Sequence, residues 1–245
     1  MRVLAHLSDL HFGRVERGVL EPLCRYVWQV HPDLVVVSGD LTQRARAREF
    51  REARAFLDTL PKPQFVVPGN HDIPLYNVFK RFVAPLGGYR RLVADEVEPS
   101  FVDDEIAVLG LNTARSFTWK GGSVSDEQLA RAEEKLCRLS ADTVKILVTH
   151  HPLPQLARLA RCGVDVLVSG HLHATSIGTT VSLVVQAGTA TSSRTREEPN
   201  SFNVLRVDRE RIDVEHHVLR SGAFVRATAQ SFERRAEGWK LRAAA

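Results

Sequence analysis

The stretch VVPGNHDIPLY, residues 66–76, places an amide, an imidazole and a carboxylate side by side directly after an apolar run. That run, FVV at residues 65–67, predicts a buried strand, because a short uninterrupted series of apolar residues suits a strand that is covered on both faces. Polar side chains at its end are poorly suited to filling a core. We therefore expect Asn70, His71 and Asp72 to belong to a functional site.

The same arrangement, polar residues directly after an apolar run, occurs at four other places. These are SDLH (residues 8–11), SGDLT (38–42), VTHHP (148–152) and SGHLH (169–173). Segments with helical periodicity at residues 20–30 and 45–60 separate the first runs, and this alternation predicts an α/β fold. In such folds ligands bind beyond the carboxyl ends of the strands, so we expect these distant blocks to converge there.

One domain is expected to span residues 1–228. Residues 73–88 predict a short helix that ends at its glycines, residues 125–139 predict a helix with capping residues in its first turn, and residues 175–228 are mostly β. A short basic C-terminal tail, residues 229–245, follows. For this tail the sequence leaves a short helix and a frayed end as alternatives.

The composition is that of an ordinary globular protein, with 44% hydrophobic and 25% charged residues. Asp9 interrupts the first apolar run, which argues against a secretory signal, and no apolar run is long enough to span a bilayer. Three cysteines without metal-binding spacing do not indicate a disulfide framework. We expect a cytoplasmic protein without a transmembrane segment. The net charge of +4 favours an anionic substrate or partner.

The five polar blocks together suit a pair of divalent metal ions. Their imidazole, carboxylate and amide ligands are a mixed N and O set, which is consistent with Mn, Fe or Zn. Two ions about 3.5–4 Å apart need a ligand that reaches both, and a carboxylate can do so. Asp40 is the natural bridge. Such ions lower the pKa of bound water, which yields a nucleophile for phosphorus at neutral pH.

In these residues the sequence resembles the calcineurin-like metallophosphoesterases, whose motifs are DxH, GD, GNHD, a later His and GHxH. All five occur in this order between Asp9 and His173. The length, HHP and GHLH are most similar to the bacterial cyclic-nucleotide and glycerophosphodiester phosphodiesterases. The resemblance implies a four-layer αββα sandwich of two mixed sheets, with the metal site at the carboxyl ends of strands.

The resemblance also implies a role for each motif residue. The metal ligands would be Asp9, His11 and His173 for the first ion, Asn70, His150 and His171 for the second, and Asp40 as the bridge. His71 would assist departure of the leaving group, and Asp72 would hydrogen-bond and orient the His71 imidazole. The implied reaction is hydrolysis of a small phosphodiester, with a 3',5'-cyclic nucleotide as a candidate, by attack of a metal-bridging hydroxide.

Three further residues are candidates for the same site. Arg14 shares the loop of the first motif and Arg194 lies in a polar loop after the last, so either could contact substrate. A solvent-exposed arginine is the alternative for each. In the HH pair, His151 is an alternative to His150 as a ligand or an orienting neighbour, and the family pattern favours His150.

Other functions stay open at this point. A nuclease is one, although nuclease relatives generally carry extra capping or dimerisation segments, for which the region after His173 leaves little room. A nucleotide-sugar-lipid pyrophosphatase and a phosphomonoesterase share the same metal core, and only the pocket walls distinguish them. A non-catalytic scaffold should have lost metal ligands, and none is missing. The sequence specifies neither the physiological substrate nor the oligomeric state.

Overall fold

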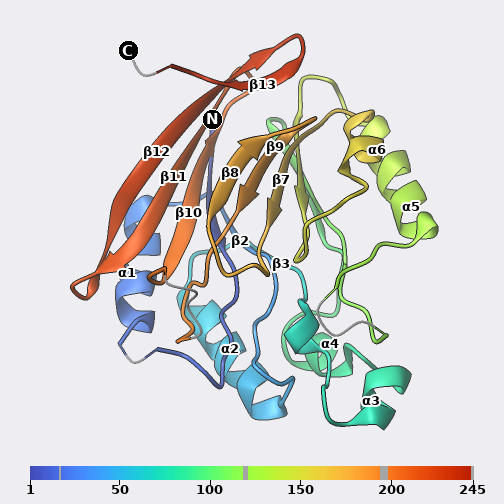
Figure 1. Ribbon diagram of the computed structural model, residues 1–245, viewed down its shortest axis with the longest axis vertical. Helices are drawn as coiled ribbons and strands as arrows, with labels where there is room; N and C mark the ends of the chain where they lie inside the picture. The colour runs from blue at the N-terminus through green and yellow to red at the C-terminus, as the bar shows by residue number, and fades with distance from the viewer. Residues whose placement is uncertain (17, 118–120, 194–197, 244–245) are drawn as a thin grey trace.

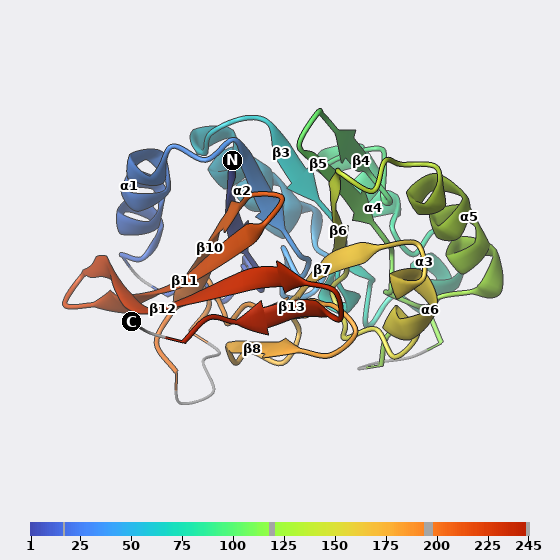
Figure 2. The same ribbon diagram turned by 90° about the horizontal axis from the view of Figure 1, so that it is seen from above.

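Two β-sheets pack face to face and helices cover their outer faces (Figures 1 and 2). The structure is a computed structural model that describes residues 1–16, 18–117, 121–193 and 198–243. Four layers, α, β, β and α, follow one another. The αββα sandwich implied by the sequence motifs is therefore confirmed.

The first sheet has seven strands, and the three at one end of it are parallel. In spatial order the strands are β13 (Gly238–Leu241), β12 (Ala223–Arg235), β11 (Arg211–Arg220), β10 (Ser201–Val207), β1 (Arg2–Leu7), β2 (Leu34–Val37) and β3 (Gln64–Val66). β1, β2 and β3 are parallel, whereas β10 to β13 join the other side of β1 as an antiparallel series. The carboxyl ends of β1 to β3 therefore lie at one edge.

The second sheet has six strands and is parallel except at its two edges. Its order is β4 (Ser100–Val102), β5 (Ile106–Gly110), β6 (Val144–Val148), β7 (Val164–Ser169), β9 (Leu183–Gln186) and β8 (Ser176–Thr179). β5, β6, β7 and β9 run parallel, and β4 and β8 pair with them antiparallel. Both sheets are thus mixed, as predicted.

Strand β2 shows why the layers form. Its four residues are buried, and successive side chains point to opposite faces of the sheet. Leu34 and Val36 join the core between the sheets, while Val35 and Val37 join the core beneath the helices. The helices over the first sheet are α1 (Leu20–Val30), α2 (Ala47–Thr59) and α4 (Gly87–Leu92), and those over the second are α5 (Asp126–Cys137) and α6 (Leu156–Ala160).

Two predicted helices have different outcomes. α5 begins as predicted: the Ser125 hydroxyl accepts from the Gln128 backbone N–H, and the Gln128 side chain accepts in return. The single helix predicted over residues 73–88 is wrong. A short helix, α3 (Val78–Val83), ends early, and the glycines begin α4. A Cβ at Gly88 would lie 2.8 Å from the Phe50 ring, so glycine allows α4 to approach α2.

The C-terminal region and the cysteines also differ from expectation. A helix at residues 229–245 is wrong, because β12 runs across residue 228 and β13 pairs with it. The indole N–H of Trp239, a buried residue of β13, donates to Asp165 at 3.1 Å. Cys137 and Cys162 form a disulfide that joins the end of α5 to the turn before β7. Among the described helices none has the length and apolar character needed to cross a membrane.

Candidate metal centre

The polar blocks of the sequence lie at the carboxyl ends of parallel strands from both sheets. Asp9 and His11 follow β1, Asp40 follows β2, the short 3-10 helix η1 (Asn70–Asp72) follows β3, His150 follows β6, and His171 and His173 follow β7. Chain segments that are more than 160 residues apart therefore meet, as the hydrogen bond from the His171 N–H to Asp9 illustrates. The sheet edge brings these side chains together.

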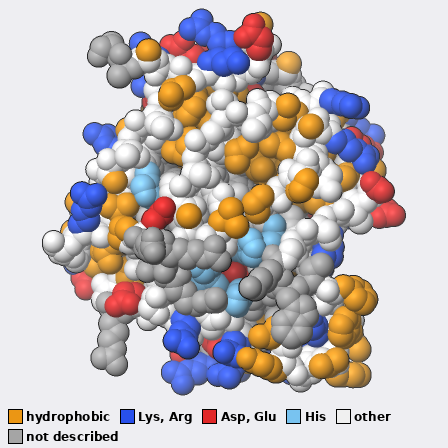
Figure 3. Space-filling model, viewed as in Figure 1, with side chains coloured by type: hydrophobic (Ala, Val, Ile, Leu, Met, Phe, Trp, Pro, Cys, Tyr) orange, Lys and Arg blue, Asp and Glu red, His pale blue; other side chains and the backbone are white. Residues whose placement is uncertain are grey.

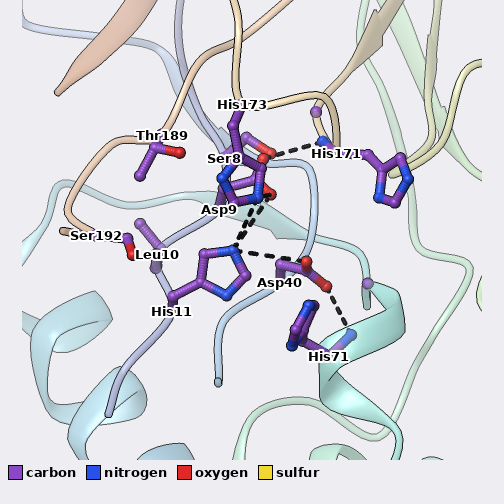
Figure 4. Close-up of polar contacts among 12 residues, drawn as sticks. Ser8, Asp9, Leu10, His11, Asp40, His71, His171, His173, Thr189 and Ser192 are labelled. Carbon is purple, nitrogen blue, oxygen red and sulfur yellow. Dashed lines mark hydrogen bonds and ion pairs between the residues drawn. The ribbon is translucent and has the colours of Figure 1, made fainter. Parts of the chain in front are cut away.

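A first group of potential ligands comprises Asp9, His11, Asp40 and His173, all of them buried. The Nε2 atoms of His11 and His173 are 3.1 Å apart, and His173 Nε2 is 3.1 Å from Asp9 Oδ1. His11 Nε2 is 3.7 Å from Asp40 Oδ2. Figure 4 shows these side chains pointing toward one another from separate loops. One ligand atom from each residue lies within 4.8 Å of the others, so they could hold one ion.

A second group comprises His150, His151 and His171, whose ligand atoms also lie within 4.8 Å of one another. His150 Nε2 is 3.3 Å from Asp40 Oδ2, the same oxygen that faces His11. Asn70 is the first residue of η1, and the backbone N–H of the next residue, His71, donates to Asp40 Oδ1. One carboxylate oxygen of Asp40 thus lies between the two groups.

Hydrogen bonds to the backbone orient these ligand atoms. The Nδ1–H of His150 donates to the Ser38 carbonyl at 2.8 Å, which turns Nε2 toward Asp40. Asp40 Oδ1 accepts from the His71 N–H at 2.8 Å, and Asp9 Oδ2 accepts from the His171 N–H at 3.0 Å. Each carboxylate therefore keeps one oxygen for the backbone and turns the other toward the imidazoles.

Three inward-facing atoms, Asp9 Oδ1, Asp40 Oδ2 and His150 Nε2, make only ion-pair contacts at 3.1–3.7 Å and no well-aligned hydrogen bond among the described residues. They are buried, and buried polar atoms without a hydrogen bond are rare in folded proteins. Carboxylate oxygen and imidazole nitrogen are ligands of divalent metals such as Mn, Fe and Zn. The unsatisfied atoms and their chemistry fit a bound cation.

Several of these residues adopt a left-handed backbone conformation. The φ angles are 54° at Asp9, 48° at His11, 53° at Asp40, 73° at His171 and 55° at His173. For an ordinary L-residue this conformation costs roughly 1–2 kcal/mol, and Asp and Asn tolerate it better because they are short and polar. Such outliers are concentrated at functional sites, where the surrounding structure enforces them.

The glycines of the motifs are required by close approach. A Cβ at Gly69 would lie 2.1 Å from Asp40 Oδ1, and a Cβ at Gly170 would lie 2.6 Å from Asp9 Oδ2. Both distances are far below van der Waals contact, so any larger residue would displace a carboxylate. The glycines of GNHD and GHLH therefore allow two loops to close over the Asp side chains.

The electrostatics also favour a cation. Burial would raise the pKa of Asp9, but the imidazoles of His11 and His173 lower it well below its usual range. Burial would likewise raise the pKa of Asp40, but the neighbouring His150 lowers it below its usual range. Burial lowers the pKa of His150, but Asp40 and Asp9 raise it to about 9. Two ionised carboxylates thus lie buried in the protein interior, where a positive charge must balance them.

The other two imidazoles of the second group stay neutral. Burial, followed by the charge of His150, lowers the pKa of His151 to about 2 and that of His171 to about 4. Neutral imidazole is the form that binds metal. The Nδ1 atom of His151 is 2.8 Å from the Thr113 hydroxyl, and its buried Nε2 has no partner among the described residues.

The hydrogen bond predicted between Asp72 and the His71 imidazole is wrong. The Asp72 carboxylate accepts instead from the backbone N–H groups of Leu41, Thr42 and Gly69 and from the Thr42 hydroxyl. The Nδ1–H of His71 donates to the Gln43 carbonyl at 2.8 Å. Asp72 therefore fastens η1 to the loop after β2, and Gln43, which the sequence did not indicate, orients the imidazole.

Of the two predicted substrate-binding arginines, Arg14 belongs to neither ligand group. Arg14 is exposed and lines a cavity of about 900 Å³ between its own loop, α1 and α2. Arg194 falls outside the described residues. The Ser38 carbonyl and the Thr113 hydroxyl, which contact His150 and His151, had no signal in the sequence because backbone carbonyls and single hydroxyls form no motif.

Comparison with known protein families shows which family the chain belongs to. A family model described as calcineurin-like phosphoesterase matches residues 2–175, which include every motif from Asp9 to His173. The chain belongs to this family. The resemblance inferred from the motifs is therefore confirmed, and family members that are similar to the chain include named phosphodiesterases.

Two curated relatives illustrate the similarity. The glycerophosphodiester phosphodiesterase GpdQ of Enterobacter lignolyticus is 29% identical over 164 residues, which cover 62% of this chain and 58% of that protein. A probable cyclic nucleotide phosphodiesterase of Synechococcus is 25% identical over 166 residues, covering 61% and 57%. The chain thus matches less than two thirds of the length of these relatives.

A solved structure shows the shared fold. A dimetal phosphatase from Danio rerio superposes with a TM-score of 0.69 at 13% identity, covering 93% of this chain and 98% of that one. At this identity the likeness concerns the fold alone. It extends over nearly all of both chains, and so includes the strands whose carboxyl ends hold the two ligand groups.

Proposed function

We propose that the protein hydrolyses a small phosphodiester with the help of two divalent metal ions, Mn, Fe or Zn. One observation carries the proposal: Asp40 Oδ2 lies 3.7 Å from His11 Nε2 and 3.3 Å from His150 Nε2. A carboxylate between two groups of imidazoles is the arrangement that a pair of ions requires. Diester hydrolysis is favoured because the two curated relatives described above are named as phosphodiesterases.

Each ion would have its own ligands. Asp9, His11 and His173 would hold the first ion, Asn70, His150 and His171 the second, and Asp40 both. When bound, such ions supply Lewis acidity to the phosphate oxygens and lower the pKa of a water nucleophile. The chain itself positions the ligands through the backbone contacts of Asp9, Asp40 and His150.

His71 would transfer a proton to the leaving group. Its Nδ1–H is held by the Gln43 carbonyl, so in the imidazolium form Nε2 is the atom that can donate. The His71 ring lies 4.9 Å from the His11 ring, edge to face, which places it beside the first ligand group. Asp72 would act on position only, because it holds η1 against the loop of Asp40. Arg14 remains a proposed phosphate contact.

The first test compares bis(p-nitrophenyl) phosphate with p-nitrophenyl phosphate, with added Mn or with chelator. We expect Mn-dependent activity with a preference for the diester. Asp40→Ala should lower this activity at least about 100-fold, because removal of even an outer contact of a metal ligand costs 10–100-fold. His31→Ala is the matched control and should retain activity, because this exposed histidine precedes β2, at the opposite end of that strand from Asp40.

The role of His71 is tested by changing the leaving group. p-Nitrophenolate needs little protonation, whereas the alkoxide released from 3',5'-cAMP or from a glycerophosphodiester needs a proton. His71→Ala should therefore reduce hydrolysis of the alkyl diester about 100-fold to 10,000-fold and reduce hydrolysis of the aryl diester much less. Equal losses on both substrates would contradict proton donation by His71.

The same alkyl substrates at equal concentration decide the substrate class. A preference for 3',5'-cAMP supports a cyclic-nucleotide substrate, and a preference for the glycerophosphodiester argues against a cyclic-nucleotide substrate. Metal content of the purified protein is measured in parallel. Protein that takes up neither Mn, Fe nor Zn would overturn the metal mechanism and favour a non-catalytic scaffold.

A further inference from the structure

Large apolar side chains are exposed together around α3. We name them the α3 patch: Tyr76, Val78, Phe79, Phe82, Val83 and Phe117. Phe79 is 74% exposed and Phe117 is 86% exposed, and the rings of Phe82 and Phe117 are 5.2 Å apart. Figure 3 shows hydrophobic side chains gathered over α3 at the lower right. Exposed apolar groups in one contiguous patch usually mark a contact surface.

Helix α3 is amphipathic, but its apolar side faces solvent and its buried side carries an arginine. The one buried residue among its six is Arg81, while Val78, Phe79, Phe82 and Val83 face outward. Arg81 donates from Nε to the Ser116 carbonyl at 2.7 Å and from its terminal nitrogen to the Pro74 carbonyl at 3.2 Å. A surface helix normally buries its apolar side. The internal contacts of Arg81 thus hold the apolar side of α3 outward.

The surroundings of the α3 patch are cationic. Residues 73–93 contain two lysine or arginine pairs, at 80–81 and 90–91, and no Asp or Glu. Lys80 and Arg91 are exposed, and so is Arg90, whose guanidinium lies 3.9 Å from the Asp95 carboxylate. The guanidinium of Arg44 lies 4.9 Å from the Tyr76 ring centroid. In Figure 3, Lys and Arg side chains lie beside the patch, and histidines lie on the same face of the molecule.

We propose that the α3 patch docks on an anionic lipid bilayer. Aromatic and aliphatic side chains with adjacent Lys and Arg are the features that place a helix in the interface of an anionic membrane. A second copy of the chain fits less well, because a symmetric contact would bring Lys80 and its neighbours against the same cations. Docking would set the carboxyl-end face, with its histidines, close to the membrane surface.

Vesicle binding of the full chain, purified in chelator, tests the proposal without any catalytic step. Vesicles of phosphatidylcholine alone are compared with vesicles that contain one third phosphatidylglycerol. We expect the protein to bind the anionic vesicles at least about tenfold more tightly, and 0.5 M NaCl should remove most of this difference.

Two variants test the two features separately. Phe79→Ser with Phe82→Ser should weaken binding at least about tenfold, because each inserted Phe side chain loses its apolar burial. Lys80→Glu should weaken binding to anionic vesicles alone. Val102→Ser with Val181→Ser, two exposed valines outside the patch, is the matched control and should bind like the wild type.

Each outcome supports or overturns the proposal. Loss of anionic binding in the Phe double variant but not in the valine control, with the circular dichroism spectrum and Mn binding unchanged, supports it. Failure of the wild type to bind anionic vesicles, or equal binding by the Phe double variant, overturns it. A wild-type dimer that becomes monomeric in the Phe double variant, without vesicle binding, would show that a second copy covers the patch. Absence of phosphodiesterase activity has no bearing on these results.

Discussion

Replacing Gly69 of GNHD by alanine should disturb the proposed metal centre, because the added methyl group has no room beside Asp40. Gly69 has φ −109° and ψ −179°, an extended conformation that alanine adopts freely. In open space the change would therefore stabilise the protein by about 0.4–1 kcal/mol, since alanine is less flexible than glycine in the unfolded chain. The added Cβ would, however, lie 2.1 Å from Asp40 Oδ1 and 2.3 Å from the Asp40 backbone nitrogen.

The size of the effect follows from these distances. Ordinary contact begins at 3.4 Å, so the chain at Gly69 and Asp40 must separate by about 1 Å. Because one of the two atoms is backbone nitrogen, no rotation of a side chain relieves the clash. Overpacking of this kind costs about 1–3 kcal/mol. Metal ligands tolerate displacements of only about 0.2 Å, so the affinity for Mn should fall at least about tenfold.

Two assays separate these consequences. Thermal unfolding in chelator should show a Tm lower by about 2–12 °C, given about 2–4 °C per kcal/mol at this chain length. Calorimetric titration with Mn should show the loss of affinity. Gly178→Ala, where nothing lies within 4 Å, is the control and should change neither quantity adversely. A Gly69→Ala protein with wild-type Tm and wild-type Mn affinity would refute the geometry on which the metal centre rests.

Three further predictions concern other parts of the molecule. Burial lowers the pKa of His150, but Asp40 raises it to about 9, so an Mn ion that binds at pH 7 must displace a proton from His150. The affinity for Mn, measured by titration calorimetry, should therefore rise up to about tenfold per pH unit from pH 6 to 8. Cys162→Ser removes a disulfide between residues 25 apart and should cost about 3 kcal/mol in thermal unfolding; a reductant that leaves the wild-type Tm unchanged would argue against the bond. Ser125→Ala removes the cap of α5 and should cost about 1 kcal/mol, with a loss below 0.3 kcal/mol as the contrary result.

The parts of the fold that could be predicted are those with an uninterrupted apolar run. β2, β6 and β7 are fully buried, and their sequences show it directly. The sequence predicted β structure as far as residue 228, but not the rest of β12 or β13, because most of their residues are exposed and many are charged. The conformation of β12 is decided by pairing with β11, and that of β13 by pairing with β12 and by the contact of Trp239 with Asp165, which are tertiary interactions. The Cys137–Cys162 pair likewise depends on two elements that meet only in the folded chain.

The same distinction applies to the candidate site. The residues that converge were predictable because motif side chains at strand ends share one sheet edge. Their orienting contacts were not, since the Gln43 and Ser38 carbonyls that hold His71 and His150 are backbone atoms, which every residue possesses. The prediction that Asp72 orients the His71 imidazole failed for the same reason. It paired the Asp72 carboxylate with the adjacent side chain, whereas in the fold this carboxylate accepts hydrogen bonds from backbone N–H groups.

The left-handed residues indicate how the centre is maintained before any ion arrives. Five such conformations, at about 1–2 kcal/mol each for ordinary residues, approach the whole stability of a typical domain. They persist because the loops after β1 and β2 bond each other: the N–H of Asp9 donates to the Gly39 carbonyl at 3.1 Å, and the N–H of His11 donates to the Asp40 carbonyl at 2.9 Å. These bonds extend the parallel pairing of the two strands beyond their ends. The two carboxylates and their imidazoles are therefore arranged by the backbone, and an incoming ion should find its ligands already in place.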